Sequence, residues 1–171
     1  MKFLYDYIFL KMDFTMLILT IGIPGAGKTT WVEKYVKKYP LTHVVSTDKI
    51  RNELTGSSNC VPEQNKMIHD EARKRVKAIL DNPANYGRHG WGPGPAIIVD
   101  STNVDVLEWI KYKQLNPTVI LAKVFDVTPE QAMKNQENRE RKVPMSVLRE
   151  KWETLQNNKG YIPHLFNLIM D

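Results

Sequence analysis

The chain has 171 residues, of which 42% are hydrophobic and 25% are charged, and its formal net charge is +5. These values are typical of a single globular domain and exclude collagen-like, fibrous and intrinsically disordered chains. The single cysteine, Cys60, excludes an intramolecular disulfide and a cysteine cage for zinc, which favours a reducing, cytoplasmic setting.

Residues 1–15 are a candidate extension ahead of the domain. Their apolar run is interrupted by Asp6 and Lys11, has no small-residue cleavage site after it and is too short to span a bilayer. We therefore expect neither a signal peptide nor a membrane partner. Met16 stands directly before the first convincing strand, so we place the domain at residues 16–171 and expect the extension to be dispensable, or the product of a wrongly assigned start codon.

Short apolar segments alternate with helical patterns along the rest of the chain. The patterns predict strands at residues 17–22, 43–46, 96–100 and 119–127. They predict helices at residues 31–39, 49–54, 62–80, 104–115, 129–138 and 144–156. Because the strands are apolar throughout and alternate with helices, we predict an α/β fold. It is a three-layer sandwich in which a parallel sheet of about four strands carries helices on both faces.

Local signals mark individual element ends. Thr128 is a predicted N-cap, with Pro129 at the first helical position and Gln131 three residues after the cap. Residues 82–95 hold four glycines and three prolines, which predicts a surface loop. Three aromatic residues recur at helical spacing and are expected to form the core stripe of the first helix: Trp31, Tyr35 and Tyr39. The four histidines are scattered along the chain and show no metal-binding spacing.

The segment between the first strand and the first helix carries a phosphate-binding motif. Residues 22–29 match G-x-x-x-x-G-K-[ST] without a mismatch. In such a loop the backbone amides surround the β-phosphate, Lys28 neutralises phosphate oxygens and the Thr29 hydroxyl holds Mg²⁺. An ordinary glycine turn does not explain Lys28-Thr29, so we predict a P-loop NTPase or kinase that binds ATP or another NTP. The expected nucleotide-binding residues are Gly22, Pro24, Gly25, Ala26, Gly27, Lys28, Thr29 and Thr30.

Two carboxylates follow predicted strands, at the sheet edge where open α/β folds bind ligands. Asp48 could accept a proton from an attacking hydroxyl, or it could simply cap the helical turn that follows. Arg51, on the same face of that turn, could bind an anionic substrate or be an ordinary surface arginine. Asp100 stands where a second Mg²⁺ ligand is expected beside Thr29, although aspartate is also common in turns.

Basic residues are unevenly distributed. Residues 66–77 carry five basic and two acidic side chains, and residues 134–151 carry six basic and three acidic ones. Each cluster could follow a nucleic-acid backbone or be a solvated helix face. Within the second cluster, Arg139 and Arg141 lie between two predicted helices. Such a segment is typical of the lid that brings an arginine to the transferred phosphoryl group, or of a solvated linker.

Taken together, the motifs resemble the kinase domain of phage-type polynucleotide 5′-kinases over about residues 16–157. TIGIPGAGKTTW is similar to that family's phosphate loop, STDKIR to its base motif, and R-x-R-K-V-P-x-x-V-L from Arg139 to its lid and final helix. The resemblance implies that Asp48 is the general base, that Arg51 contacts the acceptor nucleotide and that Arg139 or Arg141 is the lid arginine. The family's Asp-Thr-Asn motif is interrupted here, because Ser101 separates Asp100 from Thr102-Asn103.

The resemblance therefore implies an ATP-dependent kinase that transfers the γ-phosphoryl group of an NTP to the 5′-OH end of DNA or RNA with Mg²⁺. It would act in nucleic acid repair in the cytoplasm, or in the host cytoplasm if a phage encodes it. Only kinase activity is implied, because the phosphatase signature Asp-x-Asp-Gly-Thr of bifunctional family members is absent. Two alternatives share the same motifs: a kinase of a small-molecule hydroxyl (nucleoside, sugar or antibiotic) and a non-catalytic nucleotide-binding module.

Overall fold

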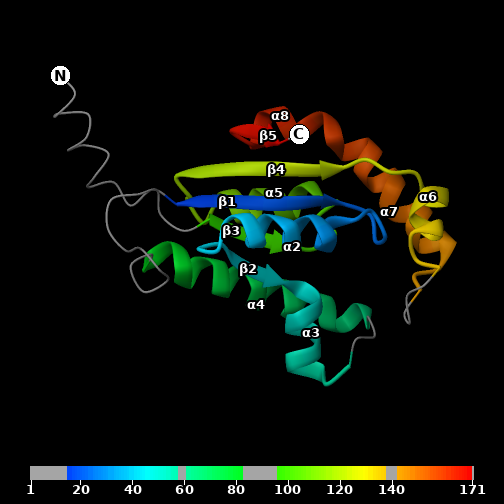
Figure 1. Ribbon diagram of the computed structural model, residues 1–171, viewed down its shortest axis with the longest axis horizontal. Helices are drawn as coiled ribbons and strands as arrows, with labels where there is room; N and C mark the ends of the chain where they lie inside the picture. The colour runs from blue at the N-terminus through cyan, green and yellow to red at the C-terminus, as the bar shows by residue number, and fades with distance from the viewer. Residues whose placement is uncertain (1–14, 58–60, 83–95, 138–141, 171) are drawn as a thin grey trace.

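The computed structural model describes residues 15–57, 61–82, 96–137 and 142–170. Within these ranges five parallel strands form one sheet in the order β2-β3-β1-β4-β5 (Figure 1). The predicted α/β sandwich is confirmed. The strands are β1 (Met16–Gly22), β2 (His43–Ser46), β3 (Ala96–Asp100), β4 (Val119–Phe125) and β5 (Leu168–Met170). The prediction of about four strands missed β5, because three residues are too few to show a strand period.

The helices lie on both faces of the sheet, which explains why its central strands are predominantly apolar. Leu17, Leu19 and Ile21 of β1 share one core cluster with side chains of α4, α5 and α7, whereas Ile18 packs with Val32 of α2 on the opposite face. Successive side chains of a strand point to opposite faces, so β1 contributes to both core layers. The bounds are α2 (Lys28–Lys38), α4 (Pro62–Asp81), α5 (Val106–Lys113) and α7 (Met145–Asn158).

The remaining helical elements are short: α3 (Thr47–Thr55), α6 (Pro129–Lys134), a 3₁₀ turn (Lys159–Tyr161) and α8 (Ile162–Leu165). The predicted cap of α6 is confirmed, because the Thr128 side chain accepts a hydrogen bond from the Gln131 amide at 3.2 Å. The predicted end of that helix at residue 138 is wrong, since α6 stops at Lys134 and the chain turns at residues 135–137. This turn places α6 beside the loop that follows β1.

The aromatic stripe of α2 is buried less than predicted. Trp31 and Tyr35 pack at the margin of the core cluster that contains Val32, and their ring centroids lie 5.0 Å apart. Tyr39 stacks on Tyr35 but is 46% exposed, so its assignment to the core is wrong. Tyr39 follows Lys38, the last residue of α2, so it lies beyond the end of the helix face that packs on the sheet.

The boundary of the domain includes one residue of the predicted extension. Thr15 is buried, donates a 3.0 Å hydrogen bond from its amide to the Thr118 hydroxyl, and accepts one from the Val119 amide through its carbonyl. Thr15 therefore belongs with the sheet. Residues 1–14, most of the loop predicted at residues 82–95, and Arg139 and Arg141 lie outside the described residues. Of the helices that the structure describes, none has the length and apolarity needed to cross a membrane.

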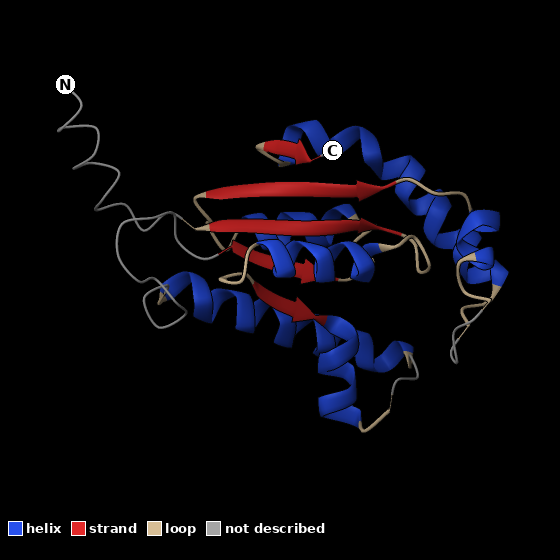
Figure 2. Cartoon of the chain, viewed as in Figure 1, coloured by secondary structure: helices blue, strands red, loops and turns tan. Residues whose placement is uncertain are grey.

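The strand order brings the candidate site residues together at one edge of the sheet. All strands point the same way, so their carboxyl ends meet at one edge (Figure 2). β3 lies between β1 and β2, and its register pairs Asp100 with Ser46, the last residue of β2. The loop after β1, the start of α3 and the end of β3 are therefore neighbours in space.

Candidate active site

The phosphate-binding motif forms a loop that joins β1 to α2. Gly25 and Gly27 have φ values of 84° and 90°, which side chains other than glycine rarely adopt. Helix α2 begins at Lys28, so the amides of its first turn face the loop and favour an anion there. The buried Lys28 Nζ donates hydrogen bonds to the carbonyls of Gly22 (2.8 Å) and Ile23 (2.9 Å). The loop is thus wrapped around its own lysine.

Helix α6 forms a wall against this loop. A Cβ atom on Gly25 would lie 2.5 Å from the carbonyl oxygen of Ala132, so only glycine fits there. Asn135, in the turn after α6, donates a 2.8 Å hydrogen bond from Nδ2 to the Gly25 carbonyl. The Asn135 amide is oriented by Gln131, whose Nε2 donates to Asn135 Oδ1 at 2.9 Å. Sequence reasoning missed this contact, because 110 residues separate the two partners and no local pattern signals it.

Thr29 and Asp100 lie next to each other at the edge of the sheet. Thr29 Oγ1 donates a 3.1 Å hydrogen bond to Asp100 Oδ2. Ser101 therefore does not turn Asp100 away from the loop, as a one-residue shift on a strand would. Burial raises the pKa of Asp100, and the Thr29 hydrogen bond and the nearby Lys28 charge partly oppose this rise.

These two side-chain oxygens fit the preference of Mg²⁺, which usually takes one or two protein oxygens and completes its shell with water and phosphate oxygens. A protein-only metal cage would need more ligands. No group of three or more His, Cys, Asp or Glu side chains suited to a metal ion occurs in the described part of the chain.

Asp48 and Arg51 form an ion pair on the first turns of α3. Ser46 is the N-cap of this helix and accepts a hydrogen bond from the Lys49 amide at 3.4 Å, so the alternative that Asp48 serves as the cap is wrong. The Asp48 side chain is 82% exposed, whereas that of Arg51 is only 9% exposed. The alternative of an ordinary surface arginine is therefore also wrong.

The Arg51 guanidinium is only partly satisfied by the described residues. Its Nη1 donates to Asp48 Oδ1, but its buried Nε has no hydrogen-bond partner among them. A buried donor without a partner costs free energy unless a ligand or water accepts from it. The arrangement therefore suits an anion bound beside Arg51.

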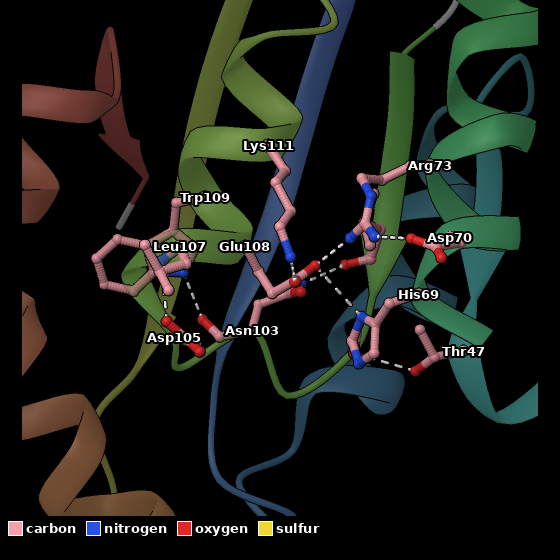
Figure 3. A network of polar contacts seen from close by, with 12 residues as sticks. Thr47, His69, Asp70, Arg73, Asn103, Asp105, Leu107, Glu108, Trp109 and Lys111 are labelled. Atoms are coloured by element: carbon pink, nitrogen blue, oxygen red, sulfur yellow. Dashed lines mark hydrogen bonds and ion pairs between the residues drawn. The ribbon is translucent and has the colours of Figure 1, made fainter. Parts of the chain in front are cut away.

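A polar network lies behind α3 and links it to α4 and α5 (Figure 3). Glu108 of α5 accepts hydrogen bonds from Arg73 and from Lys111, and His69 Nδ1 lies 3.7 Å from its carboxylate. Burial, reinforced by the charges of Arg73, Arg51 and Lys111, lowers the pKa of His69. The Glu108 charge acts in the opposite direction without overcoming burial, so the environment favours the neutral form of His69.

The ends of β1 and β3 are locked together by buried polar groups. Asn103, with φ 46°, donates from Nδ2 to the Thr20 carbonyl at 2.9 Å and accepts from Trp109 Nε1 through its own carbonyl at 2.6 Å. Thr20 Oγ1 donates to the carbonyls of Val99 and Ser101. The sequence singled out Ser101, Thr102 and Asn103 as parts of an interrupted motif after Asp100, and it offered no sign of Thr20.

The basic cluster at residues 66–77 is neutralised by its surroundings. Each of its five basic side chains forms an ion pair with a carboxylate. Three of those carboxylates, Glu53, Asp81 and Glu108, lie outside the cluster and had not been counted against its charge. For this cluster the structure favours a solvated helix face. In the second cluster, Arg149 and Lys151 also have carboxylate partners, and Lys134 and Lys142 are exposed.

Comparisons with known proteins show which family and fold the chain has. Human adenylate kinase isoenzyme 1 is 42% identical over 71 residues, which cover 42% of this chain and 37% of that protein. A chain in a solved Pnkp1/Rnl/Hen1 RNA repair complex superposes with a TM-score of 0.71 at 23% identity, covering 88% of this chain and 47% of that one. A gluconokinase from Sinorhizobium meliloti 1021 gives a TM-score of 0.60 at 14% identity, covering 92% and 82%.

At such identities the two structural matches establish the fold alone, which is that of P-loop kinases. The chain spans less than half the length of the curated relatives it matches. A family model described as an AAA domain matches residues 17–159, which is most of the sequence. The chain therefore belongs to the AAA domain family and has the P-loop kinase fold.

Proposed function

We propose that the protein is an ATP-dependent kinase that transfers the γ-phosphoryl group to the 5′-hydroxyl of DNA or RNA. The observation that carries this proposal is the Asp48–Arg51 pair. It combines an exposed carboxylate, free of any capping role, with a buried arginine that has an unused donor. Both side chains belong to the helix that starts at the same sheet edge as the phosphate loop. A hydroxyl acceptor that carries a neighbouring phosphate matches that pair.

On the donor side, the loop amides and Lys28 would bind the β- and γ-phosphates of the NTP. Lys28 would exchange its bonds to the Gly22 and Ile23 carbonyls for bonds to phosphate oxygens. Thr29 and Asp100 would hold Mg²⁺, which when bound neutralises charge on the phosphates.

On the acceptor side, Asp48 would accept the proton of the attacking hydroxyl while Arg51 binds an anionic group of the acceptor. The loose transition state of phosphoryl transfer needs little covalent assistance, so positioning and charge neutralisation would supply most of the rate. The resemblance also assigns Arg139 or Arg141 to the γ-phosphate.

A kinase of a small-molecule hydroxyl is the second candidate, and one structural observation favours it. The basic cluster at residues 66–77 would have offered a path for a nucleic-acid backbone, yet its charges are paired with carboxylates within the cluster and on neighbouring segments. The structural match to a gluconokinase fits this candidate, whereas the match to the Pnkp1/Rnl/Hen1 RNA repair complex fits the first.

The deciding experiment offers γ-labelled ATP together with one acceptor at a time. DNA and RNA oligonucleotides with a 5′-OH are compared with the same oligonucleotides carrying a 5′-phosphate, and with AMP, nucleosides and gluconate. We expect transfer only to the 5′-OH oligonucleotides, and loss of transfer in Asp48→Asn. Transfer to a small molecule alone would establish the second candidate. Nucleotide binding without transfer to any acceptor would leave a non-catalytic module.

A further inference from the structure

A buried hydrogen bond links the two segments that carry the candidate acceptor and metal residues. Thr47 Oγ1 donates to Ser101 Oγ at 3.0 Å, and both residues are more than nine-tenths buried. Thr47 directly precedes Asp48, and Ser101 directly follows Asp100. The bond lies just beyond the last paired residues of β2 and β3, Ser46 and Asp100, where the two chains begin to diverge.

The path continues from Ser101 to the strand that leads into the phosphate loop. Thr20 Oγ1 donates to the Ser101 carbonyl at 3.2 Å, and the Ser101 amide donates back to Thr20 Oγ1 at 3.4 Å. Thr20 lies two residues before Gly22, the first residue of the loop. The start of α3 is therefore connected to the phosphate loop through Thr47, Ser101 and Thr20.

Thr47 also lies beside the polar network of α4 and α5. Figure 3 shows His69 between Thr47 and Glu108, with Arg73 paired to the same carboxylate. Thr47 is therefore bonded to Ser101 through its hydroxyl and lies beside the polar network formed by His69, Arg73 and Glu108. A shift of the α3 N-terminus in either direction would break a buried contact.

We propose that Thr47 and Ser101 are a positioning pair, whose hydrogen bond fixes the distance between Asp48 and the phosphate loop. The role rests on the kinase activity proposed above. Phosphoryl transfer depends on in-line placement of acceptor and donor, and an error of about 1 Å lowers the rate of such a reaction by up to about 10²-fold. Neither hydroxyl touches substrate in this scheme, and the pair acts only through Asp48 and Asp100.

The test removes one hydroxyl at a time. Thr47→Val keeps the side-chain shape and Ser101→Ala removes the acceptor oxygen. Each is expected to lower kcat about tenfold, with the KM for ATP unchanged within about twofold. The double variant should lose no more than either single variant, because both remove the same bond. Thr47→Ser retains the hydroxyl and should recover most of the rate.

The matched control is Thr154→Val in α7, which removes a hydroxyl that donates to the Glu150 carbonyl of the same helix. It should leave kcat unchanged, and thermal melting of every variant shows whether the fold is intact. Additive losses in the double variant, or an unchanged kcat in Ser101→Ala, would overturn the proposal. So would no recovery in Thr47→Ser.

A second measurement separates this proposal from the proposed function. Amide hydrogen exchange of Thr47, Asp48 and Lys49 should accelerate in Ser101→Ala, while exchange in α7 stays unchanged. If the unmodified chain phosphorylates no acceptor but this local acceleration occurs, the proposed function fails and the pair still fixes α3. If exchange is unaltered, the pair does not position α3, whatever the enzyme does.

Discussion

Asp100 and Thr29 form a 3.1 Å hydrogen bond between the end of β3 and the first turn of α2, although the aspartate is only 9% exposed. Burial raises the pKa of Asp100, because its carboxylate loses contact with water. The ionised side chain therefore lowers the free energy of unfolding relative to a neutral one. A buried carboxylate with this effect, next to the phosphate loop, fits a functional role better than a structural one.

Asp100→Asn is expected to raise stability and lower activity. The amide can still accept the Thr29 hydrogen bond, and it removes a buried charge. The gain in unfolding free energy should be present at neutral pH. It should shrink as the pH falls through the raised folded pKa of Asp100, and vanish where the carboxyl is protonated in both states. The apparent Mg²⁺ affinity in the kinase assay should fall, because a neutral amide oxygen replaces a carboxylate oxygen.

Thermal melting at several pH values, together with magnesium titration of the rate, measures both effects. Asp105→Asn serves as the comparison. It neutralises an exposed carboxylate that caps α5, whereas Asp100→Asn neutralises a buried one. A loss of stability at neutral pH in the Asp100 variant would show that the carboxylate holds β3 and α2 together.

Lys28→Ala is expected to abolish phosphoryl transfer and to lower stability as well. Without the ammonium group, the carbonyls of Gly22 and Ile23 lose a buried donor, which costs about 1–3 kcal/mol for each group left unsatisfied. Lys34→Ala, an exposed position of the same helix, is the matched control and should change neither quantity. Near-normal turnover in the Lys28 variant would contradict the kinase proposal.

Asp48→Asn is expected to lower kcat by about 10²-fold or more and to leave the KM for ATP nearly unchanged. Thermal stability should change little, because Ser46 caps α3, the Asp48 side chain is exposed, and asparagine keeps an oxygen that can accept from Arg51 Nη1. Glu53→Gln, which removes another exposed carboxylate of α3, serves as the control and should retain full activity. A fall in melting temperature without a fall in rate would mean that the Asp48–Arg51 pair is a structural feature of the helix.

The peptide group between Gly25 and Ala26 gives a prediction for nucleotide affinity. A trans peptide points its carbonyl and amide in opposite directions, so the bond from Asn135 to the Gly25 carbonyl also fixes the direction of the Ala26 amide. Asn135→Asp removes the donor and should weaken ATP and ADP binding about two- to tenfold, with AMP binding unchanged. Asn157→Asp adds the same charge on α7 and is the control. Equal weakening of all three nucleotides would indicate a general disturbance.

Most of the fold could be predicted, because its signals are local. The apolar strands, the Gly-x-x-x-x-Gly-Lys-Thr loop and the Thr128 cap are each complete within a few neighbouring residues. Strand order was not predictable in the same way, since it depends on which distant strands share a core. The three-residue β5 was missed for want of length, and residue 138 was taken into α6 because the polar sequence that follows gives no stop signal.

The site could be predicted only in part. Asp48 and Arg51 share a helix turn, so their proximity follows from spacing alone. Their environments do not follow from spacing. The burial of Arg51 depends on how α3 packs against α4, and the capping role of Ser46 depends on where α3 begins. The contacts of Thr47 with Ser101 and of Asn135 with Gly25 join residues 54 and 110 positions apart, and such pairs leave no trace in a single sequence.

The last prediction concerns the salt dependence of an oligonucleotide acceptor. Lys134 and Lys142 are exposed and form no ion pair with the described residues, whereas Lys77 is paired with Asp81. If a nucleic-acid backbone reaches the second basic cluster, log KM should rise with log salt with a slope of roughly 0.7 for each phosphate contacted on a single strand. Lys142→Glu should reduce that slope by about one contact, which is roughly a twofold effect on KM over a threefold rise in salt. Lys77→Glu should leave the slope unchanged. If neither variant alters it, or if a mononucleotide acceptor shows the same slope, the basic surface does not track nucleic acid and the small-molecule kinase becomes the better candidate.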